Sequence, residues 1–345
     1  MGSNSSISFP DLLAPREGST NATRALTRSL AGQLKPRPRI DARSLFIDNY
    51  KLLRELLQQH ATPGLLVAAF EERRPFDYCC WSRATIDKTR PILIGRHPAC
   101  DLMVGRTQHE VSLRHLTVLL RAISFDEVRV RVLDLRSEAG FSDEQGRSLR
   151  AVTAEGSLFV RIGRVVVALL VTGETSWPDK ARDAYELIPE RVFVEERLRL
   201  INGNVPPAAA AWDWDDGCCT HVRARHGVLG LATELCSDDD ELAGTLSLSM
   251  ADQQIIRRVG KRALERGILI GRYSRCDLGC TGLTSDQLSR VHLLIVRDGD
   301  DVLAIDTASS NGTTIEGQPF RRARLINGAR LVLGGALTLG WTAQA

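Results

Sequence analysis

Apolar and polar residues alternate in several short runs of the chain after Pro63. Residues 128–132 read VRVRV, residues 246–250 read LSLSM, and residues 337–341 read LTLGW. Alternate residues of a strand point to opposite faces, so this period of two predicts strands with one apolar and one polar face. Such strands are typical of antiparallel sandwiches. The pattern predicts an all-β fold.

A different period precedes these strands. Phe46, Tyr50, Leu53 and Leu57 recur at spacings of four, three and four, which is the stripe of an amphipathic helix. We predict a short helix over residues 41–61. Residues 1–40 are rich in Ser, Thr, Asn, Pro and Arg, which predicts a disordered tail.

A linker divides the strand-rich part of the chain. Residues 178–201 are charged and more helical in pattern, and residues 202–217 read NGNVPPAAAAWDWDDG, a Pro-, Ala- and Gly-rich stretch typical of linkers. The 345 residues suffice for two domains of ordinary size. We therefore predict one domain at 62–174, a partly helical linker at 175–218 and a second domain at 219–345.

An internal repeat relates the two predicted domains. Residues 92–102 read ILIGRHPACDL and residues 268–278 read ILIGRYSRCDL, so ILIGR and CDL recur 176 positions apart. Downstream, SLRH at 112–115 matches SRVH at 289–292. The ordered recurrence of both motifs indicates two copies of one domain, called here the first copy and the second copy.

The second copy resembles the forkhead-associated (FHA) family. That family carries, in order, GR, SxxH and an NG preceded by Ser or Thr, on loops between strands of a β-sandwich. Here these are Gly271-Arg272, Ser289-Arg290-Val291-His292 and the stretch SSNGT at 309–313. The resemblance covers roughly 220–341 and implies two tandem FHA-type antiparallel β-sandwiches, with phosphothreonine as the ligand of the second.

The resemblance also implies a role for each residue. Phosphothreonine offers about 1.5 to 2 negative charges and three acceptor oxygens, so its receptor needs a cation and neutral donors. Arg272 is expected to supply the cation and Ser289 a hydroxyl donor. Arg290 and Asn311 are expected to hold the ligand backbone, and Ser310 to shape the pocket around the threonine methyl group.

Three further residues of the second copy are expected to support the site without touching phosphate. The resemblance makes His292 a tie between the binding loops. Gly312 is expected to allow the tight turn that Asn311 enters. Gly271 completes this supporting set.

The first copy departs from the motif. Leu113 replaces the polar residue of SxxH, and the turn at 137–141 reads SEAGF, so Glu138 and Ala139 stand where Ser310 and Asn311 stand in the second copy. An anion beside a phosphate pocket is repulsive. We predict a degenerate FHA-like domain with weak or no phosphothreonine binding, serving docking or dimerisation, although it retains Arg96, Ser112 and His115.

These features favour an adaptor that binds a Thr-phosphorylated protein, such as a Ser/Thr kinase or its substrate. The alternative is a phosphate-independent scaffold or dimerisation protein built from two FHA-like folds. No nucleophile, carboxylate pair or phosphate loop with usable spacing indicates an enzyme, and we expect no cofactor. We expect no metal either, because Cys218, Cys219 and His221 lack a completing CxxC.

Charge and hydropathy argue against nucleic acid and membrane as partners. The net charge is +3, and the basic clusters at 257–262 and 321–324 lack interleaved aromatic residues, so no nucleic-acid partner is expected. No apolar run is long enough to span a membrane, which predicts a cytoplasmic protein. Self-association is a further hypothesis. Thr23 and Thr27 each precede a leucine by three residues, a position that FHA-type domains often read. If a kinase phosphorylates either threonine, the tail could bind the second domain of its own or of a neighbouring molecule.

Overall fold

The structure is a computed structural model. It describes residues 41–71, 78–86, 88–106, 108–125, 127–173, 177–188, 235–250, 253–280, 283 and 287–344. The tail predicted at 1–40, including Thr23 and Thr27, lies outside these residues. So does most of the predicted linker, with Cys218, Cys219 and His221.

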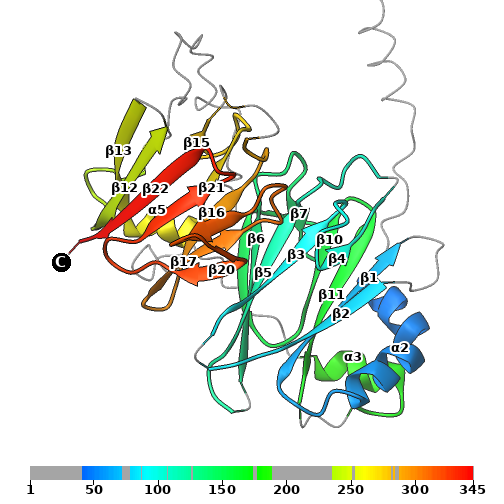
Figure 1. The fold of residues 1–345 in the computed structure, drawn as a ribbon. Helices are drawn as coiled ribbons and strands as arrows, with labels where there is room; N and C mark the ends of the chain where they lie inside the picture. The colour runs from blue at the N-terminus through cyan, green and yellow to red at the C-terminus, as the bar shows by residue number, and fades with distance from the viewer. Residues whose placement is uncertain are drawn as a thin grey trace, which may run out of the picture. The chain divides into compact units, whose positions relative to one another are not determined.

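Among the described residues, each copy has eleven strands in two sheets, and the second copy also has the short helix α5 (Lys261–Arg266) (Figure 1). The strands of the first copy are β1 (Gly64–Glu71), β2 (Tyr78–Arg83), β3 (Arg90–Gly95), β4 (Leu102–Met103), β5 (Leu116–Ala122), β6 (Val128–Asp134), β7 (Phe141–Ser142), β8 (Ser148–Leu149), β9 (Ala151–Glu155), β10 (Leu158–Ile162) and β11 (Val165–Thr172). Those of the second copy are β12 (Leu242–Met250), β13 (Gln253–Gly260), β14 (Ile268–Gly271), β15 (Leu278–Gly279), β16 (Leu293–Asp298), β17 (Asp301–Asp306), β18 (Thr313–Ile315), β19 (Gln318–Phe320), β20 (Arg322–Arg324), β21 (Arg330–Leu333) and β22 (Leu337–Ala343).

The two copies have the same strand order. The first copy has sheets β2-β1-β11-β10-β7-β8 and β4-β3-β5-β6-β9, and the second has β13-β12-β22-β21-β18-β19 and β15-β14-β16-β17-β20. Adding eleven to each strand number of the first copy gives the second. Neighbouring strands are antiparallel except for the short pairs β3–β4 and β14–β15. The predicted all-β fold with two sandwich domains is therefore confirmed.

Each sandwich has its own apolar core between its two sheets. In β3, Ile92 and Ile94 point into the core of the first copy, and in β14, Ile268 and Ile270 point into that of the second. This is the alternation expected of strands, because successive side chains point to opposite faces. The repeated sequence ILIGR thus supplies equivalent core positions in both copies.

Two helices cover the outer face of the sheet that contains β1 and β11 (Figure 1). Helix α2 (Ala42–Gln58) begins after Asp41, whose carboxylate accepts hydrogen bonds from the first free backbone N–H groups. Its buried residues are the four of the predicted stripe and Ala42. The Tyr50 hydroxyl donates to the Pro178 carbonyl at 2.6 Å. Helix α3 (Ala181–Leu187) completes this layer.

Within the unit formed by residues 40–345, the outer face of sheet β4-β3-β5-β6-β9 packs against that of sheet β15-β14-β16-β17-β20. One apolar cluster joins both copies at this interface. The first copy contributes Leu93, Cys100, Leu119, Leu133 and Leu135, and the second contributes Leu269, Cys276, Leu294, Val296, Leu303 and Ile305. These strands are therefore buried on both faces.

The predicted polar face of residues 128–132 is present in β6, but it is buried at Arg131. Arg131 is only 5% exposed, because its face of β6 lies in the interface between the copies. Its guanidinium donates to the carbonyls of Arg297 and Glu265 in the second copy. A period of two shows that a face is polar, but a polar face can still be buried when backbone carbonyls satisfy its donors.

Candidate functional site

Three loops of the second copy meet beside the ends of β14, β16 and β17. The Arg272 N–H donates to the Ser289 carbonyl at 3.0 Å, and the Tyr273 N–H donates to the Arg290 carbonyl at 2.9 Å. The third loop joins through Ser310, whose N–H donates to the Ser289 hydroxyl oxygen at 2.9 Å. All five predicted ligand-binding residues lie on these loops.

Gly271 allows the first two loops to approach. A Cβ atom at this position would overlap the Arg290 carbonyl, so only glycine fits. Gly95 stands in the same relation to the Leu113 carbonyl of the first copy. The close backbone approach, rather than an unusual φ, accounts for this glycine of the GR motif.

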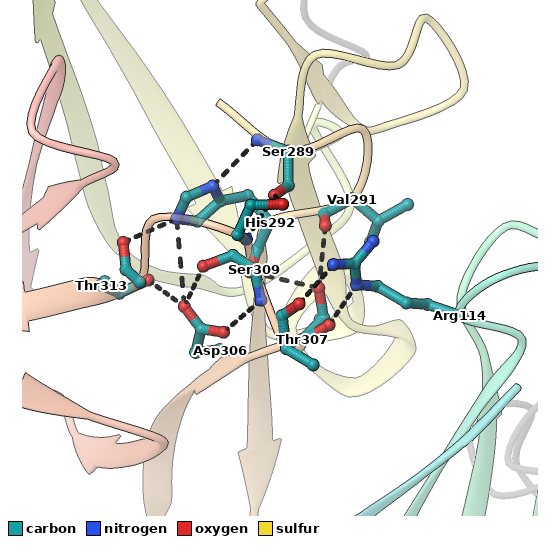
Figure 2. Close-up of polar contacts among 11 residues, drawn as sticks. Arg114, Ser289, Val291, His292, Asp306, Thr307, Ser309 and Thr313 are labelled. Atoms are coloured by element: carbon teal, nitrogen blue, oxygen red, sulfur yellow. Dashed lines mark hydrogen bonds and ion pairs between the residues drawn. The ribbon is translucent and has the colours of Figure 1, made fainter. Parts of the chain in front are cut away.

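His292 lies fully buried beneath the loops and connects two of them (Figure 2). Its Nδ1 accepts a hydrogen bond from the Ser289 N–H at 3.2 Å, so the ring proton is on Nε2, which lies 3.1 Å from the Gly312 carbonyl. Burial lowers the pKa of His292, against the opposing effect of Asp306. The neutral ring therefore ties the Ser289 loop to the Asn311 loop.

Asp306 organises the third loop from the end of β17 (Figure 2). Its carboxylate accepts from the Ser309 N–H at 2.7 Å and from the hydroxyls of Ser309 and Thr313, both at 2.6 Å. Ala308, which lies between Asp306 and Ser309 in the sequence, has a φ of 58°. This left-handed conformation is unusual for a residue with a Cβ. Sequence reasoning missed Asp306 and Thr313, although an Asp three residues before a Ser is a common turn signal.

The predicted cation, Arg272, is partly exposed. Its Nε lies 3.4 Å from the Leu288 carbonyl, which holds the base of the side chain. Within the part of the chain that the structure describes, no carboxylate forms an ion pair with its guanidinium. The positive charge of Arg272 is therefore not neutralised by a described carboxylate.

Four of the predicted ligand-binding residues are Ser289, Arg290, Ser310 and Asn311, and they differ in how exposed they are. The Ser289 side chain is nearly buried, with its residue 7% exposed, and its hydroxyl lies 3.5 Å from that of Ser310. Arg290, Ser310 and Asn311 are exposed. The arrangement presents a cation, hydroxyl groups and an amide on converging loops, which suits an anion with several acceptor oxygens.

The first copy keeps the supporting structure of this site. The Ser112 N–H donates to His115 Nδ1 at 2.9 Å, and His115 Nε2 lies 2.7 Å from the Gly140 carbonyl. Arg96 Nε donates to the Val111 carbonyl, just as Arg272 Nε approaches the Leu288 carbonyl. Burial lowers the pKa of His115 as it does that of His292.

The ligand-facing positions of the first copy differ. Asp134 accepts from Ser137 as Asp306 does from Ser309, which aligns the two turns and places Glu138 at the position of Ser310. Glu138 and Ala139 are exposed. The first copy thus keeps the loop scaffold but has the exposed Glu138 and Ala139 in place of Ser310 and Asn311.

The basic clusters considered for nucleic acid contain several ion pairs. Arg262 pairs with Asp239, Lys261 with Glu241, and Arg324 with Asp301. Arg321 pairs with Asp101 of the first copy. Over the described ranges, no helix has the length and apolar character needed to cross a membrane, and no group of three or more His, Cys, Asp or Glu side chains has the arrangement of a metal site.

Comparison with known proteins identifies the second copy. Residues 268–334 match the FHA domain family, so the second copy is an FHA domain. The first copy lies outside that match but has the same strand order. A search of curated protein sequences returned no match.

Several solved structures are similar to the chain. One is the FHA-1 structure of Mycobacterium tuberculosis Rv1747, with 20% identity over 30% of this chain and 99% of that chain and a TM-score of 0.25. Another comes from work on phosphothreonine-dependent FHA domain interactions, with 25% identity over 29% and 98% and a TM-score of 0.25. A third is the FHA domain of CT664 from Chlamydia trachomatis, with 19% identity over 30% and 99% and a TM-score of 0.26.

Proposed function

We propose that the chain is a non-enzymatic adaptor in Ser/Thr kinase signalling whose second copy binds a phosphothreonine segment of a partner protein. The observation that carries this proposal is the convergence of Arg272, Ser289 and Ser310 on three hydrogen-bonded loops of an FHA domain. Arg272 supplies the charge and the Ser289 hydroxyl donates to phosphate. Arg290 and Asn311 hold the peptide backbone, and Ser310 borders the threonine methyl group.

The expected affinity follows from the number of contacts. Hydrogen bonds to a charged group contribute about 1.5 to 3 kcal/mol each. Two or three of them, with peptide contacts, give roughly 8 kcal/mol, which corresponds to micromolar binding. Such an affinity suits a reversible signalling contact.

We propose that the first copy binds no phosphothreonine and serves architecture. Its interface with the second copy combines an apolar cluster with hydrogen bonds from the buried Arg114 and Arg131. The competing function, a phosphate-independent scaffold made of both copies, predicts that phosphorylation of a bound peptide has no effect on its affinity.

The test uses the full chain and an array of phosphothreonine peptides with randomised flanking positions. The tightest peptide and its unphosphorylated form are then titrated by calorimetry. We expect binding of the phosphorylated form alone, and loss of that binding in Arg272→Ala.

Arg96→Ala is the matched control, because Arg96 occupies the same position in the first copy and makes the same carbonyl contact. It is expected to leave the affinity unchanged. Equal affinity for both peptides would support the scaffold instead, and a loss caused by Arg96→Ala alone would assign binding to the first copy.

A further inference from the structure

Arg114 belongs to the SxxH loop of the first copy but makes its hydrogen bonds with the second. It lies one residue before His115, at the position that Val291 occupies before His292. The residue is 8% exposed, and its guanidinium crosses the interface to the loop between β17 and β18 (Figure 2). This loop carries Ser310 and Asn311.

The guanidinium of Arg114 binds two consecutive backbone carbonyls. Nε donates to the Thr307 carbonyl at 2.5 Å, and Nη2 donates to the Ala308 carbonyl. The Thr307 hydroxyl in turn donates to the Val291 carbonyl at 2.9 Å, which lies in the Ser289 loop. One arginine fork therefore holds the segment that connects the two binding loops.

The held segment contains the strained residue of the loop. Ala308 has a φ of 58°, and a left-handed conformation costs a residue with a Cβ about 1 to 2 kcal/mol. This conformation directs the chain into Ser309, which Asp306 binds, and then into Ser310, whose N–H reaches the Ser289 hydroxyl. Charged hydrogen bonds to the Thr307 and Ala308 carbonyls are strong enough to offset that cost.

The residue of the second copy that is equivalent to Arg114 makes no corresponding hydrogen bond to the first copy. Val291, at the position equivalent to Arg114, has no side-chain donor and packs beside the apolar interface cluster. At this contact the first copy therefore holds a loop of the second copy, and the second copy is the one that keeps the ligand-facing residues.

We propose that Arg114 is a positioning residue for the second copy: the first copy uses it to hold residues 307–312 in the conformation that binds phosphate. This inference rests on the proposed function for its effect on peptide affinity, but the ordering of the loop is a separate and measurable property. It gives the first copy a role that its own missing ligand contacts do not suggest.

The test compares two buried arginines of the first copy in the full chain. Arg114→Met removes hydrogen bonds to two second-copy carbonyls beside the binding loops. Arg131→Met also removes hydrogen bonds to two second-copy carbonyls, those of Arg297 and Glu265, which lie on other segments. Amide hydrogen exchange of Ser309 and Ser310 and affinity for the array-selected phosphothreonine peptide are measured in both.

We expect Arg114→Met to accelerate exchange at Ser309 and Ser310 at least about tenfold and to weaken peptide binding at least about tenfold, because it removes two charged hydrogen bonds and one alone implies about that factor. Arg131→Met is expected to change neither by more than about twofold. Arg114→Lys keeps the charge but has a single donor nitrogen in place of the planar fork, so it should recover part of both properties. If Arg114→Met does not fold, Arg114→Lys is compared with Arg131→Lys.

Equal effects of the Arg114 and Arg131 variants would overturn the inference, since both would then reflect general loosening of the interface. Unchanged exchange in Arg114→Met would also overturn it. If the wild-type chain binds no phosphothreonine peptide, the proposed function fails, and the exchange comparison still decides whether Arg114 positions the loop.

Discussion

The Arg136 guanidinium of the first copy donates to the Asp277 carboxylate of the second at 2.8 Å, across the interface between the copies. Asp101, the repeat equivalent of Asp277, receives Arg321 from the second copy at 2.5 Å. Each aspartate also accepts a backbone N–H of its own copy, from Leu269 and Leu93 respectively. The acidic residue of each CDL motif thus holds its own strand and binds the other copy.

Breaking the ion pair between Arg136 and Asp277 is expected to destabilise the folded chain. The side chains of Arg136 and Asp277 are only 20% and 11% exposed, so loss of one partner leaves a poorly solvated charge. We expect Arg136→Met to lower the free energy of unfolding by about 3 kcal/mol. Urea denaturation of Arg136→Met, Asp277→Asn and the double variant measures the coupling between the two residues.

The exposed pair of Arg43 and Glu186 is the control for this measurement. Its side chains are 49% and 68% exposed, so Glu186→Gln is expected to cost less than about 1 kcal/mol. A coupling energy near zero between Arg136 and Asp277 would contradict the prediction.

Separating the copies is expected to expose an apolar surface. Residues 235–344 alone would present Leu294, Val296 and their neighbours in the interface cluster to water. Burial of each such side chain contributes about 1.5 to 3 kcal/mol, and exposed apolar patches promote association. We expect this fragment to self-associate and to melt about 10 °C or more below the full chain.

Light scattering and thermal unfolding of the fragment test this expectation. Leu294→Lys together with Val296→Thr should restore a monomer, because both side chains face the interface rather than the core. A wild-type fragment that is monomeric and as stable as the full chain would show that the interface contributes little.

Two adjacent glycines near the site are expected to respond differently to substitution. Gly334 and Gly335 both have positive φ, of 56° and 73°, so alanine is strained at either position. A Cβ on Gly334 would also overlap the Gln287 carbonyl, whereas among the described residues, apart from its chain neighbours, no atom lies within 4 Å of a Cβ on Gly335.

We expect Gly335→Ala to cost about 1 kcal/mol and Gly334→Ala at least about 3 kcal/mol, measured by urea denaturation. The Gly334 N–H donates to the Gly312 carbonyl at 3.0 Å, so only Gly334→Ala should also disturb amide shifts in the Asn311 loop. Equal costs at the two positions would contradict the overlap with Gln287.

Acidification is expected to weaken the fold below about pH 6.5. Burial lowers the pKa of His115 and of His292, so the unfolded chain binds protons more readily than the folded chain. The stability that these neutral rings contribute is present above the unfolded pKa of about 6.5 and is lost as the pH falls below it.

Each histidine contributes a slope of at most about 1.4 kcal/mol per pH unit. Urea denaturation between pH 8 and pH 5 measures the slope. The double variant His115→Asn, His292→Asn should show a flatter dependence, and an unchanged slope would mean that other groups cause it.

The fold class and the repeat can be predicted from the sequence alone, because both depend on local patterns. Alternation in β6, β12 and β22 shows the strands, and the recurrence of ILIGR shows the second domain. The predicted ligand residues Arg272, Ser289 and Asn311 also came from motif order, since each motif occupies one short loop.

The way in which the two copies pack against each other could not be predicted from the sequence and is seen only in the folded chain. Leu93, Leu269 and Arg131 lie on faces that an isolated sandwich would expose to water, and no pattern within one copy reveals which surface covers them. Arg114 is the sharpest case: its partners, Thr307 and Ala308, are nearly two hundred positions away, at 193 and 194 residues. A backbone carbonyl can accept a hydrogen bond whatever side chain its residue carries. The sequence therefore could not predict this contact.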